Sequence, residues 1–162
     1  MANVIRVGIA DMKICKYPDM ITTIGLGSCV GVVLFDDTLK IAGLVHIMLP
    51  DSTKIKHNQN KLKFADTGIE CLVEELANKG VKLCKLKAKI AGGAKMFDFT
   101  SADSELGSIG ENNVKAVKAK LESLGISIIA EDVGLNYGRT ITFNPDTCEL
   151  MVSKAGKQYK II

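Results

Sequence analysis

The chain lacks the features that mark several common classes of protein. None of its apolar runs reaches the roughly 18–20 residues that a membrane-spanning helix needs, and its first residues lack the profile of a signal peptide. The five cysteines include no C-x-x-C pair, and aromatic residues make up only 5% of the chain. This pattern disfavours disulfide frameworks, zinc fingers and nucleic-acid grooves. We therefore expect a cytoplasmic protein with reduced thiols, no cofactor, no metal, no membrane insertion and no nucleic-acid partner.

The 162 residues are 47% hydrophobic and carry a net charge of only +3. This length and apolar content suffice for a substantial core, so we expect a single domain over residues 1–162. Helical spacing of apolar residues predicts a helix over about 62–79, and a capping box of Ser108 and Glu111 predicts the start of a second helix. The other apolar runs predict strands within 4–14 and at 21–26, 30–35, 41–49, 86–91, 126–132, 139–143 and 150–153.

Two helices among many strands, without regular alternation, favour a layered α/β fold over a Rossmann topology. We expect a mixed sandwich of two packed β-sheets with flanking helices. The strands at 30–35 and 41–49 have apolar residues on both faces, which is typical of strands covered on both sides. Gly92-Gly93 precedes Lys95, but the remainder of a phosphate-binding loop pattern is absent, so we expect a tight backbone bend there.

The polar residues at 36–39 separate two apolar runs and predict a hairpin. If its loop is centred on Asp37 and Thr38, Cys29 lies directly opposite His46. Directly opposed residues have Cβ atoms roughly 4.5–5.5 Å apart, close enough for a thiol and an imidazole to share a proton. A three-residue loop would instead turn His46 to the other face of the hairpin.

Glycines 25, 27 and 31 surround Cys29 and allow unusual backbone angles and the close approach of a substrate. This favours a reactive cysteine. A buried cysteine is also common as a small apolar residue, and a lone histidine in a strand often belongs to the core. Spacing alone leaves both interpretations open.

Six segments, spread over nearly the whole chain, carry its most distinctive motifs. They are GLGSCVGVVLFD (25–36), KIAGLVHIMLPDS (40–52), FADTGIECLVEEL (64–76), KIAGGAKMF (89–97), IGENNV (109–114) and DVGLNYGRTITFNPDT (132–147). In this order they resemble the chemoreceptor glutamine deamidase family, CheD, of bacterial and archaeal chemotaxis, and an ordered set is more specific than any single motif. Two positions depart from the pattern, because Leu135 and Cys148 stand where the family usually has glycine.

The resemblance implies a role for three residues. The cysteine of the GSC segment is the family's nucleophile, which implies Cys29, and the histidine of the LVH segment is its base, which implies His46. A threonine upstream of the cysteine helps to orient the histidine, and this implies Thr23 rather than the adjacent Thr22. The implied reaction is attack of the thiolate on a receptor glutamine, release of ammonia and hydrolysis of the glutamyl thioester to glutamate.

Backbone N–H groups in Gly27-Ser28-Cys29 are candidates for an oxyanion hole. The resemblance further implies a fold similar to the catalytic domain of cytotoxic necrotizing factor toxins. It implies two partners, the cytoplasmic domain of methyl-accepting chemotaxis receptors and a CheC-type phosphatase of phosphorylated CheY. An adaptor that regulates this phosphatase, with catalysis secondary, is the alternative function. A redox or metal-binding module is a third possibility, which the cysteine spacing disfavours.

Overall fold

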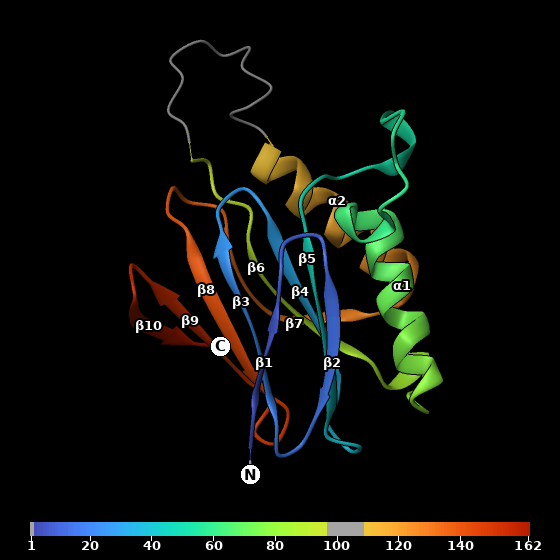
Figure 1. Ribbon diagram of the computed structural model, residues 1–162, viewed down its shortest axis with the longest axis vertical. Helices are drawn as coiled ribbons and strands as arrows, with labels where there is room; N and C mark the ends of the chain where they lie inside the picture. Colours follow the sequence, from blue (N-terminus) through green and yellow to red (C-terminus); the bar gives the residue numbers. More distant parts are fainter. Residues whose placement is uncertain (1, 97–108) are drawn as a thin grey trace.

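Two five-stranded β-sheets packed face to face form the body of the molecule, and two helices lie along one side of it (Figure 1). The computed structural model describes residues 2–96 and 109–162. Sheet A has the strand order β1 (Val4–Val7), β3 (Met20–Leu26), β8 (Arg139–Asn144), β9 (Glu149–Lys154) and β10 (Lys157–Ile161). Sheet B has the order β2 (Met12–Lys16), β5 (Ile41–Ile47), β4 (Val30–Asp36), β6 (Lys87–Gly92) and β7 (Ser127–Val133).

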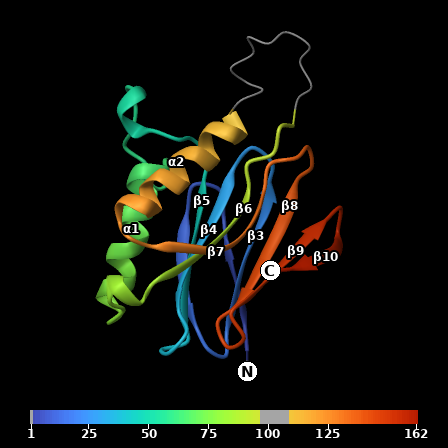
Figure 2. The ribbon, with the colours of Figure 1, turned by 180° about the vertical axis from the view of Figure 1, so that it is seen from behind.

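Both sheets are mixed. The β1–β3 and β6–β7 pairs are parallel, and the other pairs are antiparallel. Helices α1 (Ala65–Asn78) and α2 (Ile109–Ser123) cover the face of sheet B that points away from sheet A, as the view from behind also shows (Figure 2). The predicted sandwich of two sheets with flanking helices is therefore confirmed.

The core has two layers because sheet B is buried on both sides. One apolar cluster fills the space between the helices and sheet B and includes Val32, Ile69, Leu72 and Val117. The other lies between the sheets and includes Val33, Phe35 and Phe143, with the two phenylalanine rings 4.9 Å apart. Every residue of β4 and β5 is buried, which confirms that these strands are covered on both faces.

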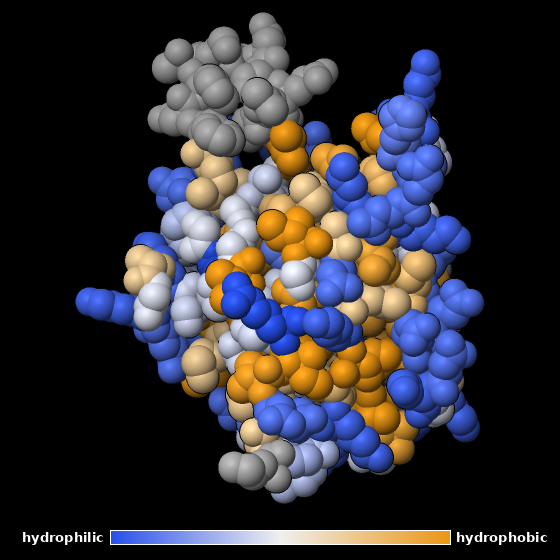
Figure 3. All heavy atoms as spheres, viewed as in Figure 1, coloured by the Kyte–Doolittle hydropathy of each residue, from blue (hydrophilic) through white to orange (hydrophobic). Residues whose placement is uncertain are grey.

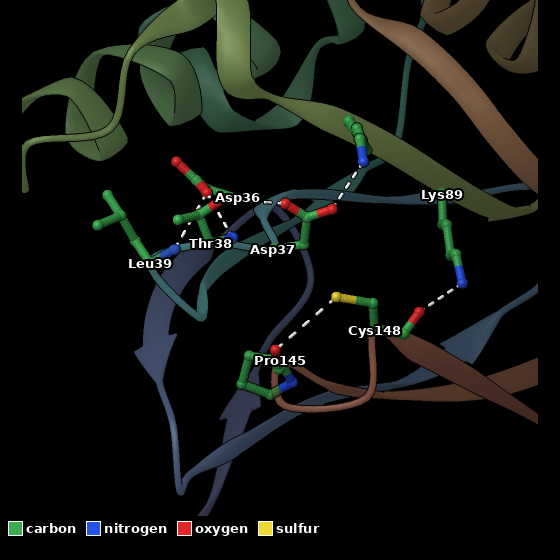
Figure 4. Close-up of polar contacts among 8 residues, drawn as sticks. Asp36, Asp37, Thr38, Leu39, Lys89, Pro145 and Cys148 are labelled. Atoms are coloured by element: carbon green, nitrogen blue, oxygen red, sulfur yellow. Dashed lines mark hydrogen bonds and ion pairs between the residues drawn. The ribbon is translucent and has the colours of Figure 1, made fainter.

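The turn between β4 and β5 differs from the predicted one. Four residues, 37–40, separate the paired residues Asp36 and Ile41, so His46 lies opposite Gly31 and not opposite Cys29. The Asp36 carboxylate accepts hydrogen bonds from the N–H groups of Thr38 and Leu39 at 2.8 and 3.1 Å (Figure 4). Lys40 closes the turn in the left-handed region. This side-chain cap stabilises a loop two residues longer than the predicted loop.

The predicted cross-strand pairing of Cys29 with His46 was thus wrong, and the observed partner of His46 lies two residues further along the chain. Because both loops are even in length, the alternation of faces along the strand is unchanged. His46 still points toward sheet A, where its ring contacts Thr23 of β3. Cys29, just before β4, packs against the apolar cluster between the sheets.

Smaller differences concern element ends. Helix α1 begins at Ala65 because a short 3-10 turn, Lys61–Lys63, precedes it. Strand β10 was not predicted; it follows a tight turn at Ala155 and Gly156, both with positive φ, where the sequence lacks the usual Asn-Gly signal. Ser108 of the predicted capping box lies outside the described residues.

The two positions that depart from the family pattern have the backbone conformation of glycine. Leu135 has φ 61° and Cys148 has φ 60°, in the left-handed region that costs an L-residue roughly 1–2 kcal/mol. Cys148 lies in the β8–β9 turn, where its carbonyl accepts a hydrogen bond from the buried Lys89 side chain (Figure 4). Its surroundings therefore hold the turn in place without glycine.

Apolar side chains also reach the surface on the side where β2 and α1 lie (Figure 3). A hollow of about 310 Å³ is lined there by Ile5, Met12 and Ile14 together with Glu75 and Lys79 of α1. In the part of the chain that the structure describes, no helix is long and apolar enough to cross a membrane.

Candidate active site

The loop 27–29 carries the chain from sheet A to sheet B, between the end of β3 and the start of β4. Its backbone is held by the segment that follows β6. The N–H of Ala94 donates to the Gly27 carbonyl and the N–H of Gly93 donates to the Cys29 carbonyl, each at 2.8 Å. Gly92 has φ 111°, and a Cβ atom there would collide with the Cys29 carbonyl oxygen. The Gly92-Gly93 pair is therefore the expected tight bend, and it supports the cysteine loop.

His46 is fully buried in β5, and a single hydrogen bond fixes its ring. Its Nδ1 lies 2.8 Å from the hydroxyl oxygen of Thr23. The same hydroxyl donates to the Val7 carbonyl, also at 2.8 Å. A threonine hydroxyl has only one proton, and a carbonyl can only accept. The proton between Thr23 and His46 must therefore belong to the imidazole, with Nδ1–H as the donor.

This assignment leaves the neutral imidazole with an unprotonated Nε2. That nitrogen is buried and has no hydrogen-bond partner among residues 2–96 and 109–162. A general-base histidine typically has one ring nitrogen that donates to a fixed acceptor and a second, unprotonated nitrogen that is free to take a proton. Nδ1 and Nε2 of His46 match these two positions. The backbone of β1, through Val7, thus determines the tautomer of a histidine in the other sheet.

Burial keeps both reactive groups neutral. Burial raises the pKa of the Cys29 thiol above its ordinary value of 9.0, and contact with its own backbone amide partly offsets this. Burial lowers the pKa of His46 below 6.5. Near pH 7 these directions favour a neutral thiol at Cys29 and a neutral imidazole at His46, rather than a preformed thiolate and imidazolium.

A family model and several curated relatives that resemble this chain all point to the same family. Residues 48–154 match the family model described as CheD chemotactic sensory transduction. The chain belongs to the CheD family. It is 58% identical over 162 residues, all of both chains, to a probable chemoreceptor glutamine deamidase CheD of Lachnoclostridium phytofermentans. It is 52% identical over 94% of both chains to the chemoreceptor glutamine deamidase CheD of Halalkalibacterium halodurans, and 48% identical to that of Bacillus subtilis over 99% of this chain and 97% of that one.

In the CheD fold Thr23 and His46 meet between the two sheets, and Cys29 packs against the apolar cluster that fills this space. Thr23 contacts His46, whereas the adjacent Thr22 donates to the Ile141 carbonyl at 2.7 Å. Cys29 is half-buried at the loop, next to Gly27 and Ser28. The catalytic roles of these residues remain predictions.

Sequence reasoning missed two further polar groups near this CheD site. Asn113 of α2 is fully buried and reaches the Ser28 carbonyl. Arg139 and Asp132 form a buried ion pair with Nε and Oδ2 2.9 Å apart, and Arg139 also holds the Gly134 carbonyl. Asn113, Asp132 and Arg139 all lie in segments that resemble the family. The only sequence signal for burial of this kind is a polar or charged residue within an otherwise apolar stretch.

The pKa directions predict how Cys29 reacts with iodoacetamide. Because the thiolate is the nucleophile and the thiol pKa is raised, the alkylation rate should increase about tenfold from pH 7 to pH 8 and should still be rising at pH 9. Peptide mapping by mass spectrometry at Cys29 measures this rate separately from that of the other four cysteines. A rate that is already constant below pH 8 would contradict the neutral pair and indicate a thiolate–imidazolium pair in the free protein.

Proposed function

We propose that the protein is a protein-glutamine glutaminase that converts specific glutamine side chains of methyl-accepting chemotaxis receptors to glutamate. The relatives are named as chemoreceptor glutamine deamidases, which supports deamidation in chemotaxis. The observation that carries the proposal is the Val7–Thr23–His46 chain of hydrogen bonds, which leaves a buried imidazole nitrogen free to accept a proton. A buried structural histidine would be expected to use both ring nitrogens.

The proposed reaction uses a thioester. Nε2 of His46 takes the proton of the Cys29 thiol as sulfur attacks the side-chain carbonyl carbon of the glutamine. The tetrahedral intermediate collapses, and ammonia leaves with the proton that His46 returns. Water, deprotonated by the same nitrogen, then hydrolyses the glutamyl thioester, which releases glutamate and restores the thiol.

The developing oxyanion needs donors, and the cysteine loop supplies candidates. Gly27 is held to Ala94, and Cys29 to Gly93, through their carbonyls. The N–H groups of Ser28 and Cys29 form no backbone hydrogen bond with the described residues. Each such donor contributes about 10²–10³ to the rate in other acyl-transfer enzymes.

The test is incubation of the protein with a receptor cytoplasmic fragment, followed by mass spectrometry for glutamine converted to glutamate and by an assay for ammonia. Conversion at defined glutamines with equal release of ammonia supports the proposal. If no receptor fragment is converted, the deamidase proposal fails.

Two finer expectations rest on the family alone. One is binding of a CheC-type phosphatase, and the alternative function is an adaptor that regulates this enzyme with catalysis secondary. An adaptor keeps its function when Cys29 is replaced by alanine, whereas a deamidase does not. The other expectation is a cytoplasmic location, as receptor cytoplasmic domains require.

Replacing Thr23 with valine should lower kcat by about 10–100-fold while KM changes little. Valine has nearly the same shape but cannot accept the Nδ1–H, so His46 is free to rotate or to adopt the other tautomer. The matched control is Thr22→Val on the same strand, because Thr22 bonds to Ile141 and not to His46. Steady-state deamidation kinetics measure both variants. Equal kcat values for the two would remove Thr23 from the mechanism.

A further inference from the structure

Asn113 links the two segments that carry Cys29 and His46. It lies in the second turn of α2 and is fully buried. Its side-chain Nδ2 donates two hydrogen bonds of 2.9 Å, one to the carbonyl of Ser28 and one to the carbonyl of Met48. An amide group has two N–H donors, so both are used. Ser28 precedes the cysteine by one residue, and Met48 follows the histidine by two.

These bonds lie where the β4–β5 ladder stops. Val30 and Ile47 form its last pair, and beyond them the cysteine loop leaves the sheet. Asn113 therefore takes the place of the next backbone pair and fixes the distance between the two strand ends. Helix α2 itself is anchored at this point, because a Cβ atom on Gly110 would collide with the carbonyl oxygens of Gly93 and Ala94.

The bond to Ser28 also fixes the direction of the Cys29 amide. Among the described residues the only cis peptide is Tyr17–Pro18, so the Ser28–Cys29 peptide is trans. In a planar trans peptide the C=O and N–H groups point in opposite directions. Because Asn113 holds the Ser28 carbonyl toward α2, on the outer side of sheet B, the Cys29 N–H points to the inner side. The Cys29 thiol packs on that inner side.

We propose that Asn113 is a positioning residue that aims the backbone N–H of Cys29 at the substrate oxygen, so that the oxyanion hole is formed before the glutamine binds. This inference rests on the deamidase proposed above and assigns that enzyme a residue outside its Cys29–His46–Thr23 group. A donor aligned in advance requires no reorganisation when charge develops on the oxygen.

A second observation separates this role from ordinary core packing. The Oδ1 atom of Asn113 is buried and has no hydrogen-bond partner among the described residues. An unpaired buried amide oxygen is destabilising, because it has lost its hydrogen bonds to water without gaining others. A leucine of similar shape would bury no unpaired oxygen but could hold neither carbonyl. The asparagine thus holds both carbonyls while its own oxygen stays unpaired, which fits a role in positioning the cysteine loop.

The experiment compares Asn113→Leu with the wild-type protein and with Asn112→Leu, an exposed neighbour on the same helix. Two rates are measured: deamidation of a receptor cytoplasmic fragment and alkylation of Cys29 by iodoacetamide. Alkylation displaces iodide from a saturated carbon and forms no oxyanion, so it reports only the thiol and its base. We expect kcat for deamidation to decrease about 10–100-fold in Asn113→Leu, as for a misplaced catalytic group, with KM and the alkylation rate within about threefold of wild type.

Three outcomes overturn the role of Asn113: an unchanged kcat, an equal loss in both reactions, or an equal loss in the Asn112 control. If Asn113→Leu does not fold, Asn113→Ser is used, because its small side chain leaves room for water at the two carbonyls. For Asn113→Ser we expect the same decrease in kcat, and the same three outcomes would overturn the proposal. The wild-type reaction separates the two proposals: a wild-type protein that converts no glutamine refutes the deamidase, whereas an active wild type with an equally active Asn113 variant refutes only the positioning role.

Discussion

Replacing Cys29 with alanine is expected to abolish deamidation, with a loss of kcat of at least about 10³-fold, because the proposed thioester forms on the Cys29 sulfur. Cys29 is half-buried at the edge of the core, so removal of its sulfur should have little effect on the fold. Mass spectrometry of a receptor fragment measures the remaining conversion. The matched control is Cys71→Ala, a half-buried cysteine in α1 that should retain full activity.

His46→Gln should show a comparable loss, and the double variant should be no worse than either single one. Residues that act as a unit in catalysis are not additive, since removal of either stops the same step. Deamidation that persists in Cys29→Ala would show that another group is the nucleophile. If the fold-loss of the double variant equals the product of the two single losses, Cys29 and His46 act in separate steps.

Asp132→Ala is expected to lower the free energy of unfolding by about 3–5 kcal/mol, because it leaves the buried Arg139 guanidinium without a counter-ion. Asp132 accepts hydrogen bonds from Arg139, from Tyr159 at 2.7 Å and from Lys160 at 2.8 Å. Small domains have only about 5–15 kcal/mol of stability in total, so this is a large fraction. Chemical denaturation followed by circular dichroism measures the difference.

The matched control is Glu131→Ala, one residue earlier on β7. Glu131 forms an exposed ion pair with Lys118 at 2.8 Å, and such a pair contributes less than about 1 kcal/mol. Equal effects of the two substitutions would mean that the buried pair contributes no more to stability than a surface pair. Arg139 also holds the Gly134 carbonyl, and the Gly134 N–H donates to Gly92 beside the cysteine loop. A destabilised Asp132 variant is therefore expected to lose activity as well.

The same pair gives stability a defined pH dependence. Burial raises the pKa of Asp132, but the bonds from Lys160, Tyr159 and Arg139 outweigh it and hold the pKa below 3.8. Since the folded state binds the proton more weakly than the unfolded state, this stabilisation is complete above about pH 4 and is lost as the pH falls through the folded pKa. The difference between wild type and Asp132→Ala should therefore decrease in acid.

The sequence by itself determined the local elements and the chemistry-bearing residues. The apolar runs specified nine of the ten strands, helical spacing specified α1, and the ordered motifs led to the CheD family and to Cys29, His46 and Thr23. These signals are local, because side-chain alternation and turn residues act over a few positions. Strand β10 was missed for the same reason, since its turn at Ala155 and Gly156 lacks a strong local signal.

Only the tertiary structure decided how those residues meet. The register of β4 and β5 depended on the Asp36 carboxylate capping a longer turn, which no count of apolar residues reveals. The tautomer of His46 depended on the Val7 carbonyl, from a strand 39 positions away that pairs in the other sheet. The two hydrogen bonds that Asn113 donates, to Ser28 and to Met48, join three segments that are far apart in the chain. Contacts of this kind form when sheets and helices pack, and the packing of distant segments is set by the whole chain rather than by any one stretch.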